Sequence, residues 1–308
     1  MGAADIIPGV SGGTVALILG IYTRLVTAIS RCDRRFLTLL SQRQWQAAAE
    51  HIDLRFLVAL AAGIGCGVVA LGSIMHTLLE DYQQQTLAVF FGLIVGSCLL
   101  VGRLVGRWRG LEFVLLALGA AGALWLVRQP VLSSPPDSLW YIFACGVVAI
   151  CAMILPGISG AFILLILGRY HEITGYIKSA LHLELTLQAI LTIAVFGIGC
   201  VTGLLAFSKC LRWLLSRHSS ETMAALCGLM AGSLWKIWPF QRDVSPPGVT
   251  EFKERVFEPV AFSEVPMNGA TLLTLLLAIG AFLFVVVLDR VAVAGKAAPS
   301  KEPATDPA

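Results

Sequence analysis

The chain has 308 residues, of which 57% are hydrophobic and only 13% are charged, and its mean hydropathy is +0.83. Soluble domains carry about 25% charged residues, so this composition excludes an ordinary soluble globular domain. Apolar runs of about 17 residues or more recur, long enough to cross a hydrocarbon core about 30 Å thick. The composition therefore predicts an all-α polytopic membrane protein, and the formal net charge of +3 says little until it is assigned to sides of the membrane.

The first predicted element is a broken apolar segment, residues 1–23. Pro8 ends a helix because proline lacks an N–H and clashes with the preceding turn, and Gly9 permits a chain reversal. Ser11 is of the type that caps the start of the next helix. We therefore expect a re-entrant helical hairpin here, with Pro8 and Gly9 at its turn.

The rest of the first half contains a connector and three apolar runs. Residues 31–55 are expected to form a basic amphipathic helix on the cytoplasmic face. Transmembrane spans are predicted at 56–79, 86–102 and 111–127. These elements make up a first repeat, residues 1–138.

The second half follows the same order of elements. A second re-entrant hairpin is predicted at 139–168, with its turn at Pro156 and Gly157. The sequence then predicts spans at 186–207, 222–238 and 270–288, which complete a second repeat at 139–293. Residues 294–308 are expected to be a disordered tail.

An internal duplication explains this parallel. Shifting the sequence by 148 residues aligns 5–22 with 153–170, and ten of the eighteen aligned pairs are identical. The segments 63–66 and 92–97 also return later, as 197–200 and 228–233. A repeat of this length indicates two copies of one structural unit.

Charge predicts how the two units are oriented. The connections 24–55, 103–109 and 208–221 are basic, which assigns them and the C-terminus to the cytoplasm by the positive-inside rule. The spans alternate consistently only if each Pro-Gly segment enters and leaves on one side. Each half then has three spans, an odd number, so the halves have opposite orientation. That is the inverted-topology repeat of many transporters.

The starts of the two inner hairpin helices are candidate anion-binding positions. Exposed N–H groups at a helix start attract negative charge, and irregular backbone inside a membrane is tolerated where it lines a cavity. The same small residues also suit close helix packing, which is the alternative interpretation. The candidate substrate-binding residues are Ser11, Gly12, Gly13, Thr14, Ser159 and Gly160.

Three ionisable residues accompany the hairpins. Asp5 is the only acid within either hairpin, so it is a candidate for proton coupling, or else an acid at the interface. Arg24 and Arg169 follow the two hairpin helices and are candidates for binding substrate charge, or for interfacial snorkelling. The eight cysteines lie singly with no histidine cluster, so we expect no metal, no disulfide and no cofactor.

The stretch Met1–Thr14, followed by Ala16–Tyr22, resembles the signature of a bacterial membrane family, the polyprenyl-phosphate transporters. The resemblance covers essentially the whole chain, including the second Pro-Gly-x-Ser-Gly motif. It implies an undecaprenyl-phosphate translocase of the bacterial cytoplasmic (inner) membrane. Such a flippase returns the carrier lipid of cell-envelope synthesis from the outer to the inner leaflet. The motif positions that carry over are Asp5, Pro8, Gly9, Ser11, Gly12, Gly13 and Thr14.

Two other functions compete with this one. The residues alone also allow a transporter of a small soluble anion, coupled to a proton or sodium ion. A membrane lipid-pyrophosphate phosphatase would require a nucleophile or base with nearby acids and an arginine clamp. No hairpin contains an acidic pair, so we expect a transporter rather than an enzyme, with membrane lipids and no nucleic acid as partners.

Overall fold

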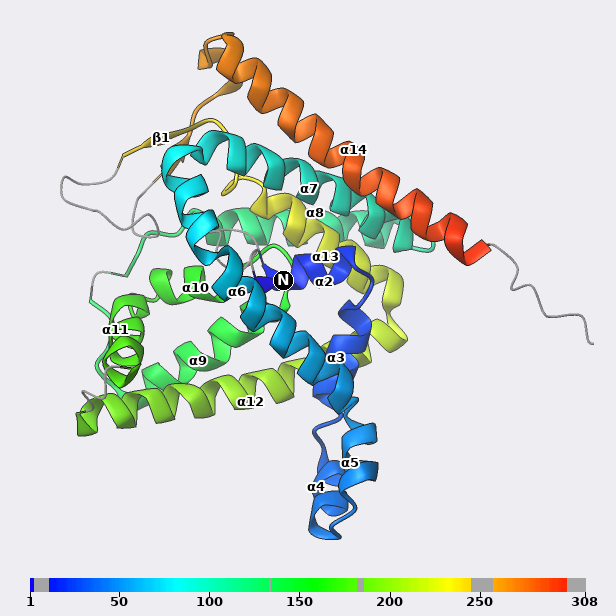
Figure 1. The fold of residues 1–308 in the computed structure, drawn as a ribbon, viewed down its shortest axis with the longest axis vertical. Helices are drawn as coiled ribbons and strands as arrows, with labels where there is room; N and C mark the ends of the chain where they lie inside the picture. Colours follow the sequence, from blue (N-terminus) through cyan, green and yellow to red (C-terminus); the bar gives the residue numbers. More distant parts are fainter. Residues whose placement is uncertain (3–10, 133, 182–185, 245–256, 298–308) are drawn as a thin grey trace, which may run out of the picture.

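The computed structural model describes residues 1–2, 11–132, 134–181, 186–244 and 257–297, and these residues are helical apart from short connections and one two-stranded ribbon (Figure 1). Among them, five helices are long and apolar enough to cross a membrane, or six if one bent pair counts as a span. The prediction of an all-helical polytopic membrane protein is confirmed.

The first half contains seven described helices, most of them apolar. They are α2 (Gly12–Ile18), α3 (Tyr22–Ser30), α4 (Arg34–Ser41), α5 (Trp45–His51), α6 (Leu54–Asp81), α7 (Gln83–Leu104) and α8 (Gly110–Val127).

The second half contains six described helices of comparable character and the ribbon. The helices are α9 (Leu139–Ile154), α10 (Gly160–Ile166), α11 (Tyr170–Leu181), α12 (Leu187–Arg217), α13 (Ser219–Ser233) and α14 (Gly269–Ala297). The ribbon pairs β1 (Gln241–Asp243) antiparallel with β2 (Phe257–Pro259), Arg242 lying opposite Glu258, and a short 3₁₀ helix, η2 (Phe262–Glu264), follows it.

Five of the six predicted spans lie within long helices, namely α6, α7, α8, α12 and α14, except that the fourth begins at Thr186, one residue before α12. The prediction for 222–238 is wrong at its end, because α13 stops at Ser233. The chain continues in a tighter turn, in which Lys236 N–H donates to Ser233 O (3.0 Å) and Ile237 N–H to Leu234 O (3.2 Å). The residues of this turn are apolar or aromatic except for Lys236, so hydropathy extended the span too far.

Two further boundaries differ from the predictions. The basic stretch 31–55 is not one helix but two, α4 and α5, because Arg43 adopts a left-handed conformation with φ 57°. The two helices project from the rest of the molecule below α3 (Figure 1). The predicted disordered tail begins too early, since α14 continues to Ala297. Residues 298–308 lie outside the described part.

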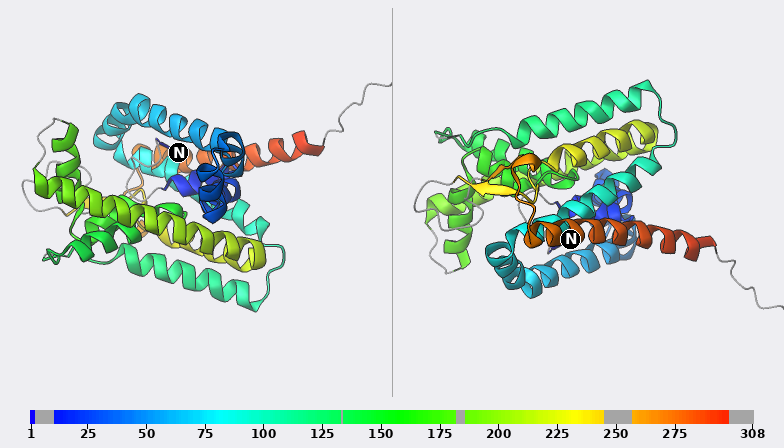
Figure 2. Two further views of the ribbon diagram at one scale, coloured as in Figure 1. Left: turned by 90° about the horizontal axis from the view of Figure 1, so that it is seen from below. Right: turned by 90° about the horizontal axis from the view of Figure 1, so that it is seen from above.

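Helices of the two predicted halves pack against one another in pairs. α7 packs on α14, and α8 packs on α13. Glycine makes both contacts close: a Cβ at Gly92 would lie 2.0 Å from Ala278 O, and one at Gly228 would lie 2.1 Å from Leu116 O. Within the second half, α9 also packs on α12. The start of the chain and α2 lie near the middle of the molecule in every view (Figures 1 and 2).

Candidate functional site

The second Pro-Gly segment reverses the chain between α9 and α10. Pro156 is fully buried, and Gly157 has φ +89°, a conformation that favours glycine. A Cβ at Gly157 would also lie 2.8 Å from Ser233 Oγ. α10 then returns along α9, since a Cβ at Gly160 would lie 2.6 Å from Ala149 O. The chain therefore forms a helical hairpin over the predicted range 139–168.

The first Pro-Gly segment is described only from Ser11 onward, so Asp5, Pro8 and Gly9 lie outside the described residues. Ser11 caps α2 as the sequence predicts, with its Oγ accepting from Gly13 N–H at 3.1 Å. After α2 the chain bends by 119° into α3.

The two inner helices end in the same motif. Gly20 (φ +68°) follows α2, and Gly168 (φ +71°) follows α10. After α2, the Gly20 N–H donates to Leu17 O at 3.0 Å and the next N–H to Ala16 O at 2.9 Å. The bonds after α10 repeat this pattern at 2.9 and 3.1 Å. This is the Schellman motif, which requires a left-handed residue just beyond the helix.

Side chains of the first segment bind the backbone of the second hairpin where α9 ends. Ser11 Oγ lies 3.1 Å from Met153 O and 3.3 Å from Leu155 O. Tyr22 Oη donates to Ile154 O at 3.2 Å. The last carbonyls of a helix have no partner within it, so these two hydroxyls satisfy groups that the break at Pro156 leaves open.

One contact runs from the second hairpin to the first. The Gly157 N–H donates to Thr14 Oγ1 at 2.9 Å, and Thr14 is 1% exposed. Together with Ser11 and Tyr22, which are also buried, Thr14 joins the two Pro-Gly segments in the interior. We call these three side chains and the backbone of 153–157 the hairpin contact.

The hairpin contact bears directly on the predicted anion site. The amides of Gly13 and Gly157 have acceptors within the protein, so neither is open to a ligand in this arrangement. In the second copy, Ser159 takes the N-cap position without a side-chain cap bond. No described residue accepts from the amides of 160–162. The structure thus brings Ser11, Thr14 and the second turn together in a closed form.

Arg169 is placed away from the hairpin contact. Its side chain is buried and forms ion pairs with Asp137 and Glu172. It also donates to Pro136 O at 2.6 Å. The charge of Arg169 is therefore balanced by two carboxylates, which ties the start of α11 to the segment before α9. Neither substrate binding by Arg169 nor interfacial snorkelling is decided by these ion pairs, which join it to Asp137 and Glu172.

Arg24 also forms an ion pair instead of reaching the hairpin contact. Its guanidinium donates to both carboxylate oxygens of Asp53, at 2.6 and 3.1 Å, and lies 4.3 Å from the centre of the Phe56 ring. The pKa of the Asp53 carboxyl lies below its ordinary value, chiefly because of the hydrogen bond from Arg24. The pair joins α3 to the start of α6.

Lys236, which was not predicted as a site residue, lies beside the second hairpin. Lys236 Nζ is 5.0 Å from the centre of the Phe162 ring on α10, within cation–π distance. Its signal was in the sequence, since Lys236 is the only lysine or arginine inside the six predicted spans. A charged residue at such a position is a functional candidate.

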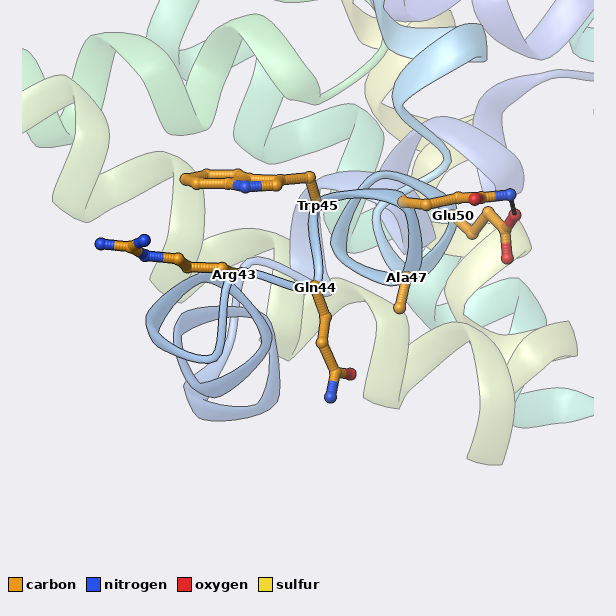
Figure 3. A pocket seen from close by; sticks show the side chains of 6 residues that line it. Arg43, Gln44, Trp45, Ala47 and Glu50 are labelled. Carbon is orange, nitrogen blue, oxygen red and sulfur yellow. Dashed lines mark hydrogen bonds between the residues drawn. The ribbon is translucent and has the colours of Figure 1, made fainter.

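A shallow surface pocket lies elsewhere, on the projecting α4–α5 unit (Figure 3). Arg43 and Trp45 extend in the same direction there, and Gln46 Nε2 donates to Glu50 Oε1 at 3.3 Å. The residues that line it are Arg43, Gln44, Trp45, Gln46, Ala47 and Glu50. None belongs to the hairpin contact, so this pocket is separate from the candidate site.

Known proteins of similar sequence indicate the family of this chain. A family model described as "Undecaprenyl phosphate translocase-like" matches residues 1–249. A polyprenyl-phosphate transporter of Vibrio cholerae is 38% identical over 245 residues, 80% of this chain and 77% of the relative. A polyprenyl-phosphate transporter of Staphylococcus aureus is 28% identical over 250 residues, 78% of this chain and 83% of the relative. No solved structure matches this chain.

The match to the family model covers most of the chain, including both Pro-Gly segments. The relatives are named as transporters and not as enzymes, so the expectation of a non-enzymatic function is confirmed. This chain therefore belongs to the undecaprenyl phosphate translocase-like family of multi-pass membrane proteins.

Proposed function

We propose that this protein moves undecaprenyl phosphate, or a similar polyprenyl phosphate, from the outer to the inner leaflet of the bacterial cytoplasmic membrane. This direction returns the carrier lipid to the side where cell-envelope synthesis uses it. The names of two relatives support the substrate. The observation that carries the proposal is the hairpin contact, which joins two broken helices deep in the protein through polar groups.

The pairing of helices supports an inverted repeat. In the sequence alignment of the halves, α7 corresponds to α13 and α8 to α14, so the α7–α14 pair and the α13–α8 pair are equivalents. Gly92 and Gly228 are also equivalent, and each contacts a backbone carbonyl of the other half. The matched Schellman motifs at Gly20 and Gly168 also support a structural repeat. Transporters with such repeats bind substrate at the repeat interface.

We propose that the phosphate binds where the two segments now meet. Opening the hairpin contact frees the Thr14 hydroxyl and the Gly157 amide, and release of the Ser11 cap frees the Gly13 amide beside Gly12. The amides near Ser159 and Gly160 approach from the other segment. Hydroxyl and amide donors suit phosphate oxygens, while the prenyl tail stays in lipid. In this scheme the basic connections face the cytoplasm, and Asp5 is the candidate for proton coupling.

Reconstituted protein tests the proposal directly. Proteoliposomes with labelled undecaprenyl phosphate in one leaflet should transfer it, and the Ser11→Ala variant should transfer it at least severalfold more slowly. Ser216→Ala removes an exposed hydroxyl of the same type and should behave as wild type. Failure of the wild-type protein to move the lipid, or release of phosphate from undecaprenyl pyrophosphate, would overturn the proposal.

Asp5→Asn tests the coupling. If Asp5 carries the proton, the variant should lose the dependence of transport on an imposed pH gradient while it retains exchange of the lipid between leaflets. Unchanged gradient dependence would exclude Asp5 as the carrier.

A further inference from the structure

Lys236 carries a positive charge that no described carboxylate balances. Its side chain is only partly exposed, and no ion pair joins it to a described acid. Arg169, the buried arginine of this region, has two carboxylate partners. A cation removed from water is costly unless an anion accompanies it. Among the described residues, therefore, Lys236 lacks the accompanying anion that Arg169 has, and a bound anionic ligand would supply it.

The position of Lys236 is fixed by the second hairpin. The end of α13 packs on the turn of that hairpin, where Gly157 faces Ser233. Three residues further on, Lys236 extends over Phe162, the third residue of α10. An anion bound to Lys236 therefore lies beside the helix that begins at Gly160.

A second cation lies at the same turn. The guanidinium carbon of Arg128, at the end of α8, is 5.5 Å from the centre of the ring of Trp235, the neighbour of Lys236. Arg128 is exposed, and no described acid pairs with it. Two cations next to aromatic rings combine charge with an apolar surface, as a charged lipid head group at a membrane interface requires.

The first half of the chain lacks both features. In the repeat alignment, Lys236 corresponds to Leu100 and Phe162 corresponds to Thr14. Leu100 lies inside the continuous helix α7, and Thr14 binds the backbone of the other hairpin. The lysine and its aromatic partner are therefore not needed for the fold that the halves share.

We propose that Lys236, assisted by Arg128, binds the phosphate monoester of the transported lipid beside the second hairpin. The two positive charges match the charge of a phosphate monoester. This inference rests on the proposed function, because it assigns a head-group site to the same substrate. Lys236 is then a specificity-determining residue, which favours a charged polyprenyl phosphate over the neutral alcohol.

Equilibrium binding of radiolabelled undecaprenyl phosphate to the purified full chain tests the inference. Lys236→Met should raise the Kd about tenfold or more, the usual effect of losing a hydrogen bond to a charged group. Lys236→Arg should bind within about threefold of wild type, and Arg128→Gln should weaken binding less than Lys236→Met. Lys209→Met, a matched change at an exposed lysine of α12, should have no effect.

Two further ligands, undecaprenol and inorganic phosphate, test whether the site binds a lipid phosphate or free phosphate. Undecaprenol should bind wild type and Lys236→Met equally, since it lacks the charge. Excess inorganic phosphate should not displace the lipid; full displacement would reassign the site to free phosphate and overturn the lipid assignment.

Two failures are distinguishable. If wild type binds and transports the lipid but Lys236→Met binds it equally well, this inference is overturned and the proposed function stands. If wild type neither binds nor transports the lipid, the proposed function fails first. Equal loss in Lys236→Arg and Lys236→Met would show a structural role for Lys236 and would also overturn the inference.

Discussion

Individual hydroxyl groups hold the two broken helices of this protein together. Ser11 and Tyr22 donate hydrogen bonds to the open carbonyls at the end of α9, and the Thr14 hydroxyl accepts one from the Gly157 amide. A break inside an apolar protein leaves polar backbone groups that must find partners. The hydroxyls of the first segment supply these partners, which gives them a structural role even without substrate.

Thr14→Val tests that role. The substitution keeps the shape of the side chain but leaves the Gly157 N–H without its acceptor, so it should lower the free energy of unfolding by about 1–3 kcal/mol. Thr14→Ser, which retains the hydroxyl, should cost less. Thermal unfolding of the purified protein measures both. Thr38→Val, at an exposed position on α4, is the control, and an equally large loss there would contradict the assignment.

The Arg24–Asp53 pair predicts a dependence on pH. Arg24 lowers the pKa of the Asp53 carboxyl in the folded protein. Its stabilisation is therefore present above the unfolded value of about 3.9, and it disappears as the pH falls through the lower, folded value. The difference in melting temperature between wild type and Asp53→Asn should be largest near pH 7 and should shrink below about pH 4. A difference that stays constant across this range would exclude the pair as its cause.

At the scale of elements, close packing of glycine decides which helices pair. Gly92 and Gly228 each face a carbonyl oxygen of the partner helix, and a Cβ at either position would lie at or within about 2.1 Å of that oxygen. Gly122 lies in α8, the helix that pairs with α13, and has no atom near its Cβ position. Small residues at helix contacts are how membrane helices approach closely.

Gly228→Ala should separate α13 from α8 and lower the melting temperature by several degrees. Gly122→Ala should leave it unchanged or raise it slightly, because alanine favours a helix over glycine by about 0.5–1 kcal/mol. Thermal unfolding of the two variants side by side makes the comparison. Similar behaviour of the two would contradict the close contact at Gly228.

Hydropathy and the positions of Pro-Gly pairs predicted most of the helices. The second hairpin and five spans follow from apolar runs and from the break at Pro156. The division of 31–55 into α4 and α5 was not predictable, because the break falls at Arg43 and not at glycine or proline. The end of α13 was not predicted, because the mostly apolar turn after it continues the hydropathy pattern of the helix.

The candidate site was predictable only in part. Ser11 and Thr14 were identified from the motif, and they do lie against the second hairpin. The ion pairing of Arg169 was not predictable, because its partner Asp137 is 32 residues away in the sequence and only the tertiary fold brings the two together. Lys236 could be singled out as the only lysine or arginine in the predicted spans, but its aromatic neighbour on α10 could not be predicted from the sequence. Local patterns identify caps and breaks, whereas partners across the fold require the structure.

For the whole molecule, charge predicts which ends face the cytoplasm. The turn between α4 and α5 belongs to the basic set of connections, whereas the loop before α14 belongs to the other set. Gln42 and Met267 are exposed in these two places.

Labelling of single cysteines tests this orientation. In a variant without the eight native cysteines, Gln42→Cys should react with an impermeant maleimide only after the membrane is opened. Met267→Cys should react in intact cells. The reverse result would invert the proposed orientation and with it the assigned leaflets.

The closed hairpin contact has a consequence for the resting membrane. Parting the two segments exposes amide and carbonyl groups to surroundings without water, and each group left unsatisfied there costs several kcal/mol. An idle molecule should consequently rest shut, and leakage of small ions through it should be negligible. Under the proposed function, a phosphate bound between the parted segments supplies new acceptors for the exposed amides, so the substrate lowers the free-energy barrier to its own transport.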